Sequence, residues 1–141
     1  MVRYYNEETS YRLPEKRRTA DWLRRVAEEE GYTLGEVTYI FCSSERHLAI
    51  NKEFLGHDYF TDIITFDYSD LEGERVVSGD IFIDVETVRD NARIYSTTFL
   101  SEMRRVVVHG VLHLCGQGDK TPEDEKEMHR KEDKYLERFN N

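Results

Sequence analysis

The chain of 141 residues is organised around one stretch, HGVLHLCGQGD, which runs from His109 to Asp119. Two histidines four residues apart on a helix lie one above the other on the same face, where one metal ion can contact both imidazoles. Gly116 allows the helix to end and the chain to turn back, so that a carboxylate a few residues later can reach the same ion. Catalytic zinc sites use three protein ligands and leave one position to water. The spacing therefore predicts an open site formed by His109, His113 and Asp119.

The same histidine pair also has a purely structural interpretation. Histidines on an apolar helix are often core residues whose ring nitrogens bond to nearby polar groups, and a pair four apart is only moderately specific. Here the flanking residues are three valines, 106–108, and Val111 with Leu112. Unsatisfied imidazoles in such dry surroundings would be unfavourable, and a metal would satisfy them. The glycine and the following aspartate add to the case for a metal.

Length and charge limit the function classes. A chain of this length fits one domain, 1–141, which can bury a core without disulfides. The net charge of -9 and the pI near 5.1 argue against a broadly basic nucleic-acid-binding surface, but not against a local basic cleft. Cys42 and Cys115 have no metal-finger spacing and are expected to be buried thiols. The polar N-terminus lacks an apolar run of signal or membrane length, which favours a cytoplasmic protein.

Hydrophobic periodicity predicts a chain of mixed helices and strands. The expected strands are 2–5, 36–42, 62–68 and 79–84, and the expected helices are 14–30, 45–54, 85–95, a long one ending near 114, and 122–139. Ser96 or Thr97 is the expected cap of the long helix. Its core stripe would be Leu100, Met103, Val107, Val111 and Leu114, and its cleft face Glu102, Arg105, Val106, His109 and His113. The charged run of the last helix is expected to be a solvated face, with His129 at the surface.

The signature and three further segments resemble the YbeY family of bacterial rRNA-maturation endoribonucleases. These segments are INKEFLGHDYFTDIITF (50–66), SGDIFID (78–84) and EDEKEM (123–128). The resemblance implies an α+β fold, with a small mixed sheet packed by helices and a metal cleft at the signature helix. It also implies one divalent metal per chain, with zinc the first candidate, and a hydrolase that cuts single-stranded RNA. The implied partners are ribosomal RNA and the ribosome, in maturation of the small-subunit RNA and in ribosome quality control.

Two positions depart from the family pattern. Asp119 stands where the family usually has a third histidine; a carboxylate can replace the imidazole, and the resulting set also suits ferrous iron or other divalent ions. Leu55 stands where the family commonly has an arginine associated with activity. Arg105, on the histidine face of the long helix, is our candidate for a phosphate contact. No side chain is identified as a general base, and the sequence does not fix the oligomeric state.

Two other function classes remain open. Zinc metallopeptidases also hold zinc with two histidines four apart, but they place a glutamate base directly after the first, where this chain has Gly110. A peptidase would therefore need its base from another part of the chain. The second alternative is a non-catalytic RNA- or ribosome-binding assembly factor whose metal is structural.

Overall fold

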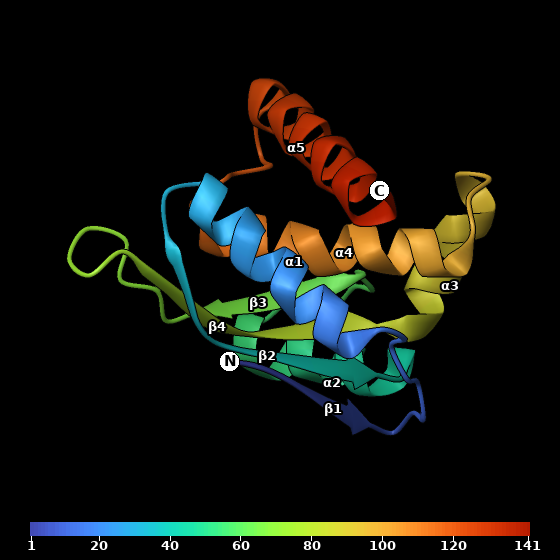
Figure 1. Cartoon of the computed structure of the whole chain (residues 1–141). Helices are drawn as coiled ribbons and strands as arrows, with labels where there is room; N and C mark the ends of the chain where they lie inside the picture. Colours follow the sequence, from blue (N-terminus) through green and yellow to red (C-terminus); the bar gives the residue numbers. More distant parts are fainter.

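The computed structural model describes all 141 residues and contains four strands and five helices (Figure 1). The strands are β1 (Val2–Glu7), β2 (Thr33–Cys42), β3 (Ile63–Asp67) and β4 (Val76–Asp84), and the helices are α1 (Lys16–Glu29), α2 (Ser44–Leu55), α3 (Val85–Ile94), α4 (Phe99–Leu114) and α5 (Pro122–Asn140). The expected α+β class is confirmed. Each predicted element is present, with ends that differ by a few residues.

The strands form one mixed sheet in the order β1-β2-β4-β3. β2 lies parallel to both β1 and β4, while β3 is antiparallel to β4. Parallel neighbours need a long crossover. Helix α1 supplies it between β1 and β2, and the segment containing α2 and β3 supplies it between β2 and β4.

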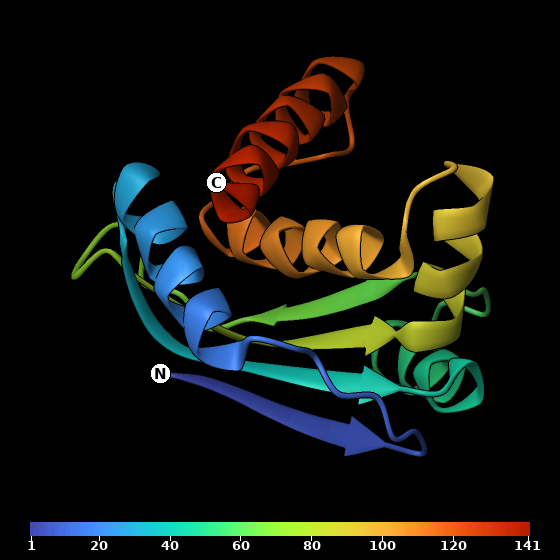
Figure 2. The ribbon, with the colours of Figure 1, turned by 45° about the vertical axis from the view of Figure 1, so that its right-hand side comes forward.

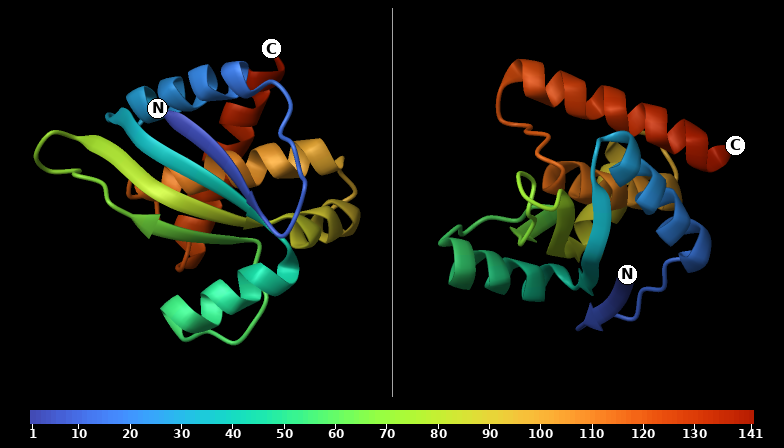
Figure 3. Two further views of the ribbon diagram at one scale, coloured as in Figure 1. Left: turned by 90° about the horizontal axis from the view of Figure 1, so that it is seen from below. Right: turned by 60° about the vertical axis from the view of Figure 1, so that its left-hand side comes forward.

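Alternation along the strands divides the apolar side chains between two cores of unequal size. On β2, Tyr39 and Phe41 belong to the main core of 26 buried residues, whereas Ile40 and Cys42 belong to a second core of four. The main core lies under α1 and α4, and the second lies under α2 on the opposite face of the sheet (Figures 2 and 3). The sheet is therefore buried mainly on its α4 side.

Helix α4 lies between the sheet and α5, which corrects the expected division of its faces (Figure 2). The hydroxyl of Tyr39 on β2 donates to the Val107 carbonyl at 2.7 Å and ties the helix to the sheet. Glu102 and Val106, expected on an open face, are buried, because α5 and α3 pack against α4 from the other side. The cap was also misplaced: the side chain of Thr98 accepts the Ser101 N–H at 3.0 Å, one residue after the predicted Thr97.

Both cysteines are free and buried, as expected. Burial raises the pKa of the Cys42 thiol and of the Cys115 thiol to about 12, which keeps both thiols protonated and unreactive at neutral pH. None of the helices combines the length and the apolar character that crossing a membrane requires.

Gly110 brings α4 close to the sheet. A Cβ at this buried position would lie 2.8 Å from Cδ1 and 3.1 Å from Cγ2 of Ile81 on β4. The position that a metallopeptidase gives to its glutamate base therefore faces the packed sheet and has no room for a larger side chain. A zinc peptidase built on this helix would therefore still need its base from another part of the chain.

We predict that Gly110→Ala destabilises the protein by about 1 kcal/mol, because overpacking outweighs the better helix propensity of alanine. Ile81→Val removes the Cδ1 atom that the new methyl group would meet. Urea unfolding of both single variants and of the double variant gives the coupling between them. The double variant should lose clearly less stability than the sum of the single losses; strict additivity would contradict the close approach.

Candidate functional site

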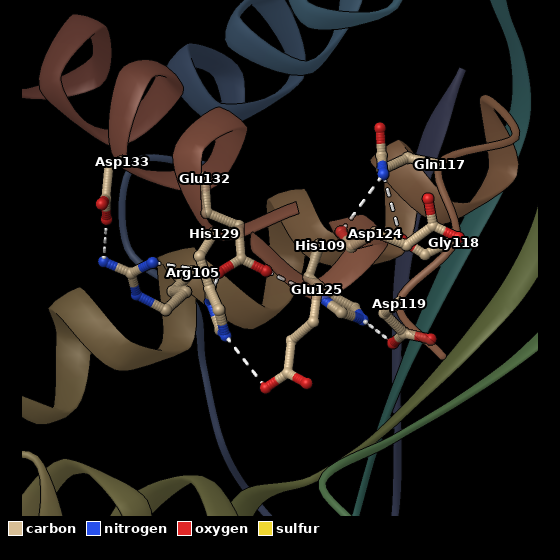
Figure 4. Close-up of polar contacts among 10 residues, drawn as sticks. All are labelled: Arg105, His109, Gln117, Gly118, Asp119, Asp124, Glu125, His129, Glu132 and Asp133. Atoms are coloured by element: carbon tan, nitrogen blue, oxygen red, sulfur yellow. Dashed lines mark hydrogen bonds and ion pairs between the residues drawn. The ribbon is translucent and has the colours of Figure 1, made fainter. Parts of the chain in front are cut away.

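The signature places His109 between two carboxylates that come from later parts of the chain (Figure 4). Its Nδ1 donates to Oε2 of Glu132 on α5 at 2.7 Å, and its Nε2 lies 3.4 Å from Oδ2 of Asp119. Asp119 returns toward α4 because the helix ends at Leu114 and Gly116 adopts a positive φ of 91°. The turn predicted from the glycine is confirmed, and it brings His109 and Asp119 together.

His113, one turn along α4, is not joined to the other two predicted ligands by a hydrogen bond or an ion pair. Its Nδ1 is buried without any hydrogen-bond partner. As the side chains stand, no three histidine, cysteine, aspartate or glutamate residues lie close enough together to hold a metal ion. The donor types nevertheless fit a divalent metal: an imidazole whose Nδ1 is buried and unpaired, a second imidazole, and a carboxylate facing the latter.

Glu132, which is not among the predicted site residues, has more polar partners than any other side chain of the site. Only 3% of its side chain is exposed, and besides His109 it accepts from Arg105 Nη1 at 2.9 Å and from His129 Nδ1 at 3.2 Å. The charged run of α5 was expected to be solvated. A usable signal was present, because Glu132 recurs at helical spacing with the buried Met128, Tyr135, Leu136 and Phe139.

Burial and pairing act in opposite directions on this histidine and this glutamate. Burial alone would lower the pKa of His109, but the hydrogen bond and charge of Glu132 raise it above the ordinary histidine value. Burial alone would likewise raise the pKa of Glu132, but its hydrogen bonds with His109 and Arg105 hold it below the ordinary value. In both groups the pairing outweighs the burial.

Arg105, the predicted phosphate contact, already has two carboxylate partners. Its Nη1 donates to Glu132 at 2.9 Å and its Nη2 to Asp133 at 2.6 Å. The Arg105 side chain remains 30% exposed, whereas the Asp133 side chain is 68% exposed. The phosphate contact stays a prediction, and Asp133 is the group with which a phosphate would compete.

A cavity of about 610 Å³ opens beside His109. Its walls include four carboxylates together with Arg105 and His129; the carboxylates are Asp62, Glu102, Glu125 and Glu132. Burial raises the pKa of Asp62 and of Glu102. A cavity of this composition favours a cation over an anion. His109 lines it, but His113 and Asp119 do not, so the expected cleft exists only on the His109 side.

His129 and Leu55 both lie at the surface. His129 is 59% exposed, as expected, and is held between Glu132 and Glu125, whose Oε1 lies 3.8 Å from its Nε2. Leu55 is 42% exposed and is the last residue of α2, which is capped by Gly56 with a positive φ of 68°. The loop that follows leads to Asp62 on the cavity wall.

Comparisons with known proteins agree with the expected family. The family model described as Endoribonuclease YbeY matches residues 3–140. The chain is similar to the Endoribonuclease YbeY of Cytophaga hutchinsonii, 44% identical over 94% of this chain and 92% of the relative, and to that of Bacteroides thetaiotaomicron, 45% identical over 96% of both. The solution structure of TM1509 from Thermotoga maritima superposes with a TM-score of 0.70 at 30% identity, covering 99% of this chain and 89% of that one. The resemblance read from the sequence is confirmed, and the chain belongs to the Endoribonuclease YbeY family.

Proposed function

We propose that this protein is a metal-dependent endoribonuclease that cuts single-stranded RNA during ribosomal RNA processing. The observation that carries the proposal is the family match over residues 3–140, which makes the chain an RNA-cleaving hydrolase. Maturation of the small-subunit RNA, ribosome quality control and a cytoplasmic location are part of the proposal. The histidine that faces Asp119 beside the cavity supports it independently.

The proposed ligands of the metal are His109, through Nε2, His113 and Asp119, with zinc as the first candidate. When bound, a divalent cation supplies Lewis-acid polarisation of a phosphodiester and lowers the pKa of a neighbouring water. Asp119 contributes a negative charge where the family usually has a neutral imidazole. It therefore reduces the net positive charge of the filled site, so the substrate phosphate gains less attraction there.

The chain's own residues must bind RNA in spite of the net charge of -9. The charged side chains of the cavity wall, leaving the two histidines aside, are four carboxylates and Arg105, so a phosphate is favoured only beside Arg105. A single strand can bend one nucleotide into such a cavity, whereas a duplex keeps its backbone on a rigid helix. We therefore expect weak, salt-sensitive binding and a preference for single strands.

A specific observation also favours the non-catalytic alternative. Leu55 replaces, with an aliphatic side chain, the arginine that we associate with activity in the family. It lies on the segment that leads into the cavity wall, where an arginine would have added a positive charge. If that charge is required for cleavage, the protein would bind RNA or the ribosome without cutting.

We predict that the wild type holds about one divalent metal per chain and that His113→Ala holds much less. Asp119→His should retain the metal, because imidazole binds zinc at a similar distance to a carboxylate oxygen. Elemental analysis after dialysis against zinc measures both effects. His57→Ala is the matched control, since His57 is exposed and bonds only to Tyr59. Equal metal in the wild type and His113→Ala would exclude the proposed ligand set.

For cleavage, the wild type should cut a single-stranded RNA but not the same sequence as a duplex. The cuts should disappear with chelator and in His113→Ala, because the reaction needs the metal. Gel analysis of end-labelled RNA at several salt concentrations measures this. RNA binding without metal-dependent cuts would favour the assembly factor, and Leu55→Arg would then be the first variant in which to look for cleavage.

The phosphate contact of Arg105 is best tested by changing Asp133, the carboxylate with which a phosphate would compete. Asp133→Asn should strengthen binding of single-stranded RNA several-fold, because it frees Arg105 Nη2 and removes a negative charge beside it. Arg105→Lys should weaken binding less than Arg105→Ala. Fluorescence anisotropy at low salt measures all three variants. A gain in Asp133→Asn that persists when Arg105 is also replaced by alanine would show that the charge change, not an arginine–phosphate contact, is responsible.

A further inference from the structure

Glu132 and Asp119 contact opposite sides of one imidazole, and the two contacts differ in kind. The Glu132 carboxylate, only 3% exposed, accepts a hydrogen bond from His109 Nδ1 at 2.7 Å. The half-exposed Asp119 carboxylate lies 3.4 Å from Nε2, which is an ion-pair distance but not a hydrogen bond. A neutral imidazole has a single N–H, and a carboxylate that accepts at close range holds that proton on the nitrogen it faces.

We infer that Glu132 is a positioning residue for His109: it holds the ring proton on Nδ1, and so leaves the Nε2 lone pair directed toward Asp119. The inference rests on the proposed metal site, where Nε2 is the donor atom. Metal-binding histidines commonly donate their other N–H to a carboxylate or carbonyl, which fixes the ring and its tautomer. In this chain the partner comes from α5, 23 residues further along the sequence.

The carboxylate is itself oriented by Arg105. The Arg105 guanidinium donates to Oε1 of Glu132, and His129 Nδ1 lies 3.2 Å from the same oxygen. The other oxygen, Oε2, is therefore left for His109. Arginine only donates hydrogen bonds, so whatever atom occupies the Oε1 position must accept. The neighbouring histidine can adapt, because a histidine nitrogen either donates or accepts. The arginine therefore decides which atom of residue 132 faces His109.

The hydrogen bonds of Glu132 allow a test that distinguishes a positioning role from a merely structural one. Glu132→Gln has the same shape as the wild type, but Arg105 should keep the amide oxygen and turn the amide nitrogen toward His109. That nitrogen donates, so His109 Nδ1 must accept and the ring proton moves to Nε2, where it opposes metal binding. Removing Arg105 as well frees the amide to rotate. The double variant Glu132→Gln with Arg105→Ala should therefore recover the original tautomer.

The test measures the His109 tautomer by long-range ¹H–¹⁵N correlation in the metal-free protein, at a pH where the ring is neutral. The wild type should have the proton on Nδ1, Glu132→Gln on Nε2, and the double variant on Nδ1 again. Zinc affinity, measured by competition with a chelating dye, should fall about 10- to 100-fold in Glu132→Gln. Part of this loss should be recovered in the double variant. Asp133→Asn is the control, because it alters a contact of Arg105 without touching His109.

A wild-type ring with its proton on Nε2, or a Glu132→Gln ring with the same tautomer as the wild type, would overturn the inference. So would equal zinc affinities in proteins whose tautomers differ. The tautomer is read without metal or RNA, so its failure is distinguishable from failure of the proposed function. A protein with the expected tautomers that cuts no RNA would refute the nuclease and leave the role of Glu132 intact.

Discussion

Burial of the Glu132 carboxylate between α4 and α5 is the constraint on which the site depends. A charge removed from water is strongly unfavourable unless its partners satisfy it, and here Arg105, His109 and His129 all do so. The position of α5 is therefore linked to the orientation of His109. The helix is fixed on its other side as well, since Trp22 of α1 donates to the Tyr135 carbonyl at 2.8 Å and Lys131 pairs with the half-buried Glu30 at 2.6 Å. Polar contacts thus hold α5 in one register against both helices that it covers.

The buried Glu132 carboxylate also contributes to the negative charge of the site. Carboxylates predominate around His109, because Glu132 and Asp119 contact the ring and Asp62 and Glu102 line the cavity beside it. A cation lowers the energy of this arrangement, while a phosphate raises it wherever Arg105 does not compensate. The acidic composition that argues against a broadly basic RNA-binding surface is thus compatible with a metal centre. It implies that RNA contacts are few and local.

The sequence was most informative where a single local pattern was enough to predict an element or a turn. The hydrophobic pattern predicted all four strands, with ends that differ by a few residues, and the glycine after His113 correctly located the end of α4 and the return of Asp119. The prediction from sequence was wrong on α4, where further helices pack on the side away from the sheet. The stripe on α4 was assigned on the assumption of one apolar neighbour, but α5 and α3 cover the other side, so Glu102 and Val106 are buried. The cap was ambiguous because Ser96, Thr97 and Thr98 are all hydroxyl residues, and only the backbone decides: Ser96 has a positive φ of 54°.

The missed glutamate shows what kind of pattern identifies a site of this type. On α5 the charged residues are so numerous that a solvated face explains most of them, and charge alone cannot separate Glu132 from its neighbours. The position on the helix does separate it, because Glu132 falls on the buried stripe of Met128, Tyr135 and Phe139. A lone carboxylate there would be severely unfavourable. Its presence there implies a donor on the facing helix. The polar residues that helix α4 directs toward α5 include Arg105 and His109, and both donate to Glu132. The two helices therefore have to be read together. Glu132 on the apolar stripe of α5 and His109 on the apolar helix α4 predict the hydrogen bond between them, which the sequence of either helix alone does not.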